Sequence, residues 1–232
     1  MTIRLKDGLA ALADEFALSV GGHASPEEGM CAMELVAFLD GQAHTDRPRC
    51  TSFAIADFVR HINDNMPEDL RQGLLPYLPR LVGTASEELE PARDQYFAWQ
   101  TIKVFAPAAL RSQGYRGFAS RLERAKYFYD AQEVSRGILA AMSEKRVVQP
   151  VGLAVHRAYR AAASASYAAK GDDDPLRFLD ELSSCGYLAA SAAFHSHLAG
   201  SLGIWEKIFE TLEGVLSIGQ PSPAEISRGS YR

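Results

Sequence analysis

Five residues whose side chains bind metals or perform acid–base chemistry lie within one stretch of the chain. They are Cys31, Glu34, His44, Asp46 and Cys50. Zinc in proteins is held by thiolates, imidazoles and carboxylates. The sequence therefore predicts a candidate metal site with Cys31, His44 and Cys50 as ligands and zinc as the metal. The spacing Cys-x12-His-x5-Cys is not that of a zinc finger, so a purely structural role for these residues is the alternative: a small core thiol, a surface histidine and a turn-capping aspartate.

The same residues suit catalysis. A cysteine near a helix N-terminus is stabilised as the thiolate, with His44 as base and Asp46 as the group that orients it. Glu34 lies in an otherwise apolar run, where burial would raise its pKa and suit it to general acid–base catalysis. The structural alternative is a buried inert thiol and an ion pair between Glu34 and an arginine, with three candidates nearby: Arg47, Arg49 and Arg60.

Three further groups carry weaker signals. His195 and His197 are two residues apart, so their side chains diverge on a helix. Tyr127, Phe128 and Tyr129 are interleaved with Arg121, Arg124 and Lys126, a pattern that stacks on bases but is commoner as core plus a solvated stripe. The acidic loop 172–174 lacks the spacing of a calcium loop and suits helix capping.

The elements that position these groups are helices throughout. Apolar residues recur three or four apart, and Ser25, Pro26 and Glu28 form a predicted capping box. Gly and Pro punctuation then predicts helices over about 5–20, 26–40, 52–63, 67–82, 86–106, 118–146, 150–170, 175–199 and 202–216. Residues 42–50 form a polar loop between the second and third helices. No alternating pattern predicts a strand, so we expect an all-α, single irregular bundle of about eight to ten helices.

The helix punctuation also suggests an organisation along the chain. Residues 1–84 form a predicted N-terminal subdomain that carries the candidate site, and 85–218 form a helical bundle. The segment 219–232 is predicted to be a flexible tail.

Bulk composition narrows the partners. The net charge of −5 disfavours nucleic acid, and the odd number of cysteines, three, disfavours a disulfide framework and favours a reducing compartment. The first twenty residues contain acidic side chains within the apolar pattern, unlike a signal peptide. No apolar window is long enough to cross a membrane. We therefore expect a cytoplasmic protein.

The motif Gly29-Met30-Cys31-Ala32-Met33-Glu34, then His44-x-Asp46-x-Pro48-x-Cys50, then Asn63-Asp64 and 74–84, resembles a family of bacterial and phage-encoded helical proteins. The resemblance covers about residues 20–84. It implies a phage, prophage or bacterial context and no particular activity.

Two functions are consistent with these patterns. The first is a helical protein–protein interaction module, phage- or prophage-related, that acts in regulation or assembly through another protein or through self-association. The second is a metal-dependent or cysteine-dependent enzyme acting on a small molecule, with its site in the helix-loop-helix 29–60. If the second function holds, the candidate catalytic residues are Cys31, Glu34, His44 and Asp46.

Overall fold

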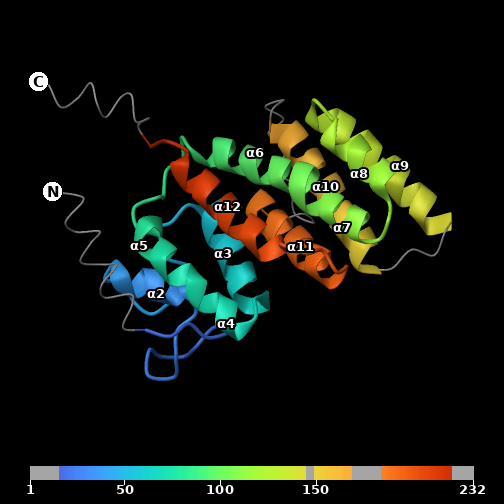
Figure 1. Cartoon of the computed structure of the whole chain (residues 1–232). Helices are drawn as coiled ribbons and strands as arrows, with labels where there is room; N and C mark the ends of the chain where they lie inside the picture. Colours follow the sequence, from blue (N-terminus) through green and yellow to red (C-terminus); the bar gives the residue numbers. More distant parts are fainter. Residues whose placement is uncertain (1–15, 145–148, 169–183, 221–232) are drawn as a thin grey trace, which may run out of the picture.

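The computed structural model describes residues 16–144, 149–168 and 184–220, and most of these residues are helical (Figure 1). Within these ranges no strands pair into a sheet. The described residues contain an isolated parallel β-bridge between Leu18 and Met30. The all-α prediction is confirmed. No helix in the described ranges is long and apolar enough to cross a membrane.

The first described helices gather at one end of the molecule, at the lower left of Figure 1. They are α2 (Ala32–Leu39), α3 (Phe53–Asn65), α4 (Glu68–Arg71) and α5 (Leu78–Leu81), with a 3₁₀ turn over Gln72–Tyr77. Helix α3 begins as predicted, because the hydroxyl of Ser52 accepts a hydrogen bond from the backbone N–H of Ile55.

The remaining helices form the rest of the bundle, with α8 and α9 at the opposite end from α2 (Figure 1). They are α6 (Glu90–Gln100), α7 (Ala106–Ser112), α8 (Arg116–Glu123), α9 (Phe128–Glu144), α10 (Gln149–Ala168), α11 (Cys185–Leu198) and α12 (Ile204–Ser217). A π-helical turn over Thr101–Phe105 joins α6 to α7. The predicted helix over 86–106 extends further than expected: the chain stays helical to Ser112, with Pro107 in the first turn of α7 directly after the π-helical turn.

Two predictions about the N-terminal region are wrong. Residues 16–20 are not helical, because Leu18 is extended and both its backbone N–H and its carbonyl bond the side-chain amide of Gln72. The second helix begins at Ala32 rather than Pro26. The residues that close its capping box are Cys31 and Glu34, because Gly29, at φ 130°, interrupts the chain after the predicted start.

A third prediction, one long helix over 118–146, is also wrong. The chain leaves the helix after Glu123 and starts again at Phe128. The ammonium group of Lys103 satisfies two carbonyls at this break: it donates to the Glu123 oxygen at 2.6 Å and also to the Ala125 oxygen. These bonds replace those that a continuous helix would have made.

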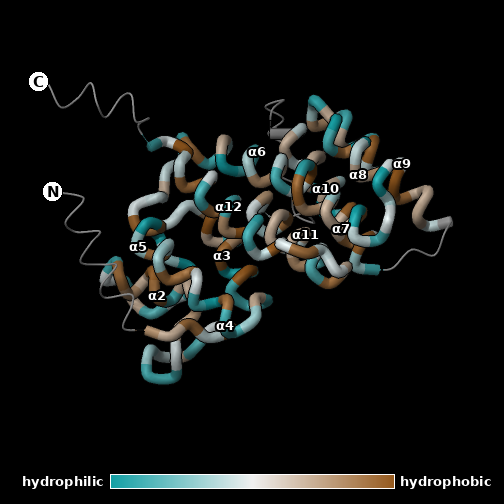
Figure 2. Tube along the Cα trace, in the orientation of Figure 1, coloured by the Kyte–Doolittle hydropathy of each residue, from teal (hydrophilic) through white to brown (hydrophobic). Residues whose placement is uncertain are grey.

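The main hydrophobic core joins the first helices to the rest of the chain. Fully buried side chains of α2 and α3 pack with those of α6, α11 and α12, including Phe58, Phe97 and Ile208. Figure 2 shows how hydrophobic and hydrophilic residues alternate along these helices. Helix α11 approaches the backbone of α3 closely at Gly186, where an added Cβ would lie 1.9 Å from the carbonyl oxygen of Ala54. The acidic loop 172–174, the helix start at Pro175 and the predicted tail beyond Gln220 fall outside the described residues.

Candidate functional site

The carboxylate of Glu34 is the centre of a buried polar cluster at the start of α2. Only 2% of this residue is exposed. Its Oε1 accepts the backbone N–H of His23 at 2.7 Å, and its Oε2 accepts the backbone N–H of Cys31 at 2.8 Å. Oε2 also lies 2.8 Å from Nδ1 of His23. The prediction of an ion pair between Glu34 and an arginine is wrong, because histidines take that place.

These hydrogen bonds decide the charge of Glu34. Burial alone would raise the pKa of its carboxyl, but the hydrogen bonds from the Cys31 and His23 amides and the His23 ring outweigh it and lower the pKa. An ionised carboxylate only accepts hydrogen bonds. The His23 ring therefore carries a proton on Nδ1, facing Glu34.

Ser19 occupies the other side of the His23 ring. Its Oγ lies 2.9 Å from Nε2 of His23 and 3.2 Å from the carbonyl oxygen of Met30. Serine hydroxyl, imidazole and carboxylate thus form a continuous relay, Ser19–His23–Glu34, in which the base contacts the hydroxyl through one nitrogen and the carboxylate through the other. Nucleophile, base and orienting acid stand in this order in serine hydrolases of unrelated folds.

Backbone contacts explain how Ser19 reaches this place. The Ser19 N–H donates to the Met30 oxygen at 2.9 Å. The buried amide of Asn63 donates to the Ser19 carbonyl at 2.9 Å and accepts from the N–H of Ala32 at 3.2 Å. Helix α3 therefore fixes both the strand-like segment of Ser19 and the first turn of the helix that carries Glu34.

Gly29 packs directly against the relay. A Cβ at this position would lie 2.9 Å from Oγ of Ser19 and 3.1 Å from Nε2 of His23, and its φ of 130° already requires glycine. The backbone of Gly29 therefore covers one side of the Ser19–His23 pair.

A second histidine contacts the same carboxylate. Nε2 of His44 lies 2.9 Å from the carbonyl oxygen of His23 and 3.4 Å from Oε1 of Glu34. The loop 42–50 is thereby tied to the segment that carries the relay. Because Nε2 has the His23 carbonyl as its nearer partner, His44 holds the loop in place rather than extending the relay.

The predicted zinc ligands do not converge. Sγ of Cys31 is buried and accepts the N–H of Glu34 at 3.5 Å, whereas Cys50 lies beside the hydroxyl of Thr51. In the three described ranges, no group of three or more His, Cys, Asp or Glu side chains is arranged to hold a metal ion. His44 belongs to the Glu34 cluster and to no cysteine.

The thiols are also poorly suited to nucleophilic attack. Burial raises the pKa of Cys31 to about 12, and burial raises the pKa of Cys50 as well. Asp46 does not orient His44. Its carboxylate lies 3.3 Å from Nε of Arg60, and its backbone carbonyl accepts two further bonds from the same guanidinium.

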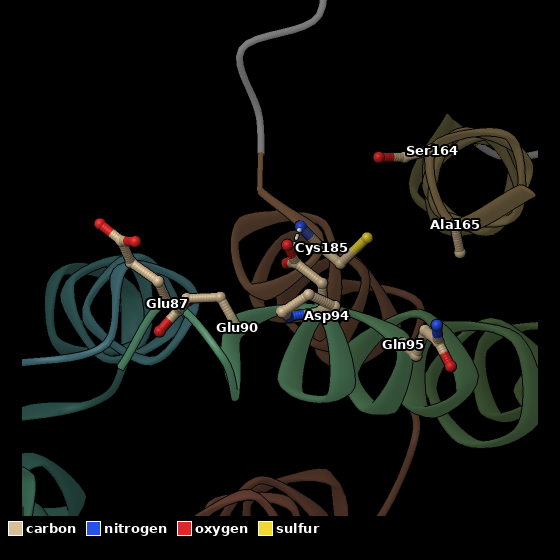
Figure 3. A pocket seen from close by; sticks show the side chains of 8 residues that line it. Glu87, Glu90, Asp94, Gln95, Ser164, Ala165 and Cys185 are labelled. Carbon is tan, nitrogen blue, oxygen red and sulfur yellow. Dashed lines mark hydrogen bonds between the residues drawn. The ribbon is translucent and has the colours of Figure 1, made fainter. Parts of the chain in front are cut away.

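A separate pocket of about 370 Å³ lies between α6, α10 and the first turn of α11 (Figure 3). Its residues include Glu87, Glu90, Asp94, Ser164 and Cys185. Asp94 accepts the backbone N–H of Cys185 at 3.2 Å, and burial raises the pKa of Asp94 to about 6. Burial also raises the pKa of the Cys185 thiol to about 12, so this thiol is as poorly suited to nucleophilic attack as Cys31 and Cys50.

The C-terminal histidines point to different neighbours, as their spacing predicts. Nδ1 of His195 lies 2.6 Å from the carbonyl oxygen of Ser191, one turn earlier on α11. The ring of His197 packs on Trp205 of α12, with 4.8 Å between the ring centroids. Neither ring approaches the Glu34 cluster.

Sequence reasoning missed Ser19 and His23. The apolar spacing places Ser19 at the end of the predicted helix 5–20 and His23 in no predicted element, on either side of the Gly21-Gly22 pair. Their relation to Glu34 depends on contacts with Gln72 and Asn63, which the local pattern does not contain.

Comparison with protein-family models, curated proteins and solved structures finds no match for this chain.

Proposed function

We propose that this protein is a hydrolase that transfers acyl groups from small esters or amides through Ser19, with His23 as the base and Glu34 as the orienting acid. The observation that carries the proposal is the relay itself: 2.9 Å from Oγ of Ser19 to Nε2 of His23, and 2.8 Å from Nδ1 of His23 to a buried carboxylate oxygen. Both distances lie in the range required of a nucleophile, its base and its orienting group.

The reaction follows from these positions. Oγ of Ser19 attacks the carbonyl carbon while its proton moves to Nε2 of His23, and the Glu34 carboxylate stabilises the imidazolium. The proton then passes from Nε2 to the leaving alcohol or amine, which leaves an acyl ester on Ser19. Water attacks this ester, gives a proton to Nε2, and releases the acid as Ser19 regains its hydrogen.

A fluorophosphonate probe tests the proposal, because it forms a covalent bond only with an activated serine. We expect labelling of the full chain at Ser19, located by tandem mass spectrometry, together with hydrolysis of p-nitrophenyl acetate. Ser19→Ala should abolish labelling, and His23→Gln should slow it by about 100-fold or more, the usual contribution of a general base.

Ser25→Ala is the matched control, because Ser25 lies in the same loop and its side chain bonds the Glu27 carboxylate instead. Its labelling and hydrolysis should equal those of the unchanged protein. Absence of label on Ser19 in folded protein, or equal hydrolysis by the Ser19→Ala variant, would refute the proposal.

The interaction-module reading stays a second candidate, and one observation favours it. Leu198 is 53% exposed and Leu202 is 99% exposed, and both lie at the turn between α11 and α12. Gly200 and Gly203, both at positive φ, fix this turn and hold the apolar side chains in solvent. Self-association through this turn predicts a dimer in light scattering that Leu202→Asp converts to monomer. A monomer at all concentrations would argue against it.

A further inference from the structure

The turn between α8 and α9 presents aromatic rings on a fixed backbone. Phe128 anchors it by stacking on Trp99, with 4.4 Å between the ring centroids. Lys103 lies 4.9 Å from the centroid of the same Trp99 ring and donates to the turn carbonyls of Glu123 and Ala125. A turn held in this way loses little conformational freedom when it binds a ligand.

Two tyrosines flank that anchor and point into solvent. Tyr127 is 57% exposed and Tyr129 is 60% exposed. Their rings are nearly parallel, with an interplanar angle of 5° and centroids 5.4 Å apart. The expectation that aromatic residues here would be core holds for Phe128 and is wrong for Tyr127 and Tyr129.

Three cations lie on α8 and in the turn that carries the tyrosines. Arg121, Arg124 and Lys126 are exposed, and none of them forms an ion pair with another described residue. The Arg121 guanidinium extends across to α9, where it lies 3.9 Å from the position of a Cβ on Gly137. The nearby carboxylate of Glu123 is already neutralised by a bidentate pair with Arg111. Three cations thus stand against one further carboxylate in this stretch, Asp130, so the surface is locally positive on a chain whose net charge is −5.

We propose that the surface formed by Tyr127, Tyr129, Arg121, Arg124 and Lys126 binds single-stranded nucleic acid. Exposed aromatic rings next to unpaired cations are the chemistry that stacks bases and neutralises phosphates, without sequence preference. Recognition of anionic lipid headgroups typically uses four to eight basic residues, whereas this surface has three. The inference is independent of the hydrolase proposal, because the Ser19 relay lies at the other end of the molecule.

The test is fluorescence anisotropy of labelled fifteen-nucleotide oligo(dT) and oligo(rU) with the full chain, at several salt concentrations. Replacing both tyrosines, Tyr127→Ala with Tyr129→Ala, should weaken binding about tenfold or more, since stacking contributes about 1–3 kcal/mol per base. Replacing Arg124→Gln with Lys126→Gln should reduce the slope of log K against log salt by about 1.4, or about 0.7 for each phosphate contact on a single strand.

Arg49→Gln is the matched control. Arg49 is also an exposed cation, in the loop before α3, and its loss should leave affinity and salt slope unchanged. Thermal melts verify that all variants are folded. No binding of either oligonucleotide at about 50 mM salt, or binding that the tyrosine and cation variants do not change, overturns the proposal. Binding to phosphatidylserine vesicles without binding to oligonucleotides overturns it too, in favour of a membrane surface.

Discussion

Nδ1 of His23 lies 2.8 Å from Oε2 of Glu34, and the same carboxylate also accepts the backbone N–H of His23. One buried acid therefore fixes both the ring and the backbone of the histidine that contacts Ser19. Because these are hydrogen bonds to a charged group in a buried site, the cluster stabilises the fold as well as positioning the base.

Glu34→Gln should disturb both roles of this carboxylate, the stability of the fold and the position of His23. The effect on stability is the one that we expect to be clear. The amide keeps the shape of the side chain. Its NH2 group, however, would face N–H groups from which the carboxylate accepts hydrogen bonds, so those hydrogen bonds are lost. We expect a loss of roughly 3 kcal/mol in the free energy of unfolding, or about 6 to 12 °C in Tm for a domain of this size, measured by circular dichroism. Glu28→Gln, an exposed acid in the same loop, should change stability by less than about 0.5 kcal/mol. Equal Tm values for the two variants would contradict the buried cluster.

Asp94→Asn should stabilise the protein at neutral pH. The pKa of Asp94 is raised to about 6 in the folded state, above the ordinary value of 3.8. Its contribution to stability is therefore fully present below pH 3.8 and is lost as the pH rises through 6, by at most roughly 3 kcal/mol. Asparagine keeps an acceptor for the N–H of Cys185 without a charge. Urea unfolding should show a gain at pH 7.5 that vanishes near pH 4; a gain that is the same at both values would exclude this account.

His61 gives a pH dependence of the opposite sign. Its ring packs against Tyr187 and Phe194, and Nε2 has no hydrogen-bond partner among the described residues. Burial lowers the pKa of His61 to about 4, outweighing the nearby carboxylate of Asp64. The neutral ring stabilises the fold above pH 6.5, and this contribution is lost as the pH falls through 4, by at most roughly 3 kcal/mol.

Removing that titration is the test. His61→Phe should lose less stability than the unchanged protein between pH 6.5 and 4.5 in urea unfolding. Measurement at pH 8, where the imidazole is neutral in both states, isolates the packing change and serves as the reference. Parallel stability curves for the two proteins across this range would show that His61 does not titrate as proposed.

The helical class was predictable because apolar spacing is a local property, and helices such as α3 and α12 begin close to their predicted residues. The candidate site was predictable only in part. Glu34 and His44 were identified by residue type, but their partner His23 was not, because the contact depends on Leu18 being extended by Gln72 and on Asn63 bridging two segments. The break before α9 was missed for the same reason: the group that stabilises it, Lys103, is distant in sequence.

The close contact between α3 and α11 at Gly186 allows us to predict how an added methyl group changes stability. A Cβ on Gly186 would lie 1.9 Å from the oxygen and 2.8 Å from the carbon of the Ala54 carbonyl, both rigid backbone atoms. The two helices must separate to admit a methyl group, so Gly186→Ala should destabilise the fold by about 3 kcal/mol or more. Gly152, in the first turn of α10, has no atom of the described residues within 4 Å of its Cβ position, apart from its neighbours and the backbone of its own helix. Gly152→Ala should therefore stabilise the protein by about 0.5–1 kcal/mol through helix propensity alone. Urea unfolding of the two variants should shift in opposite directions, and a shared direction would show that the approach of α11 to α3 is looser than the Gly186 geometry requires.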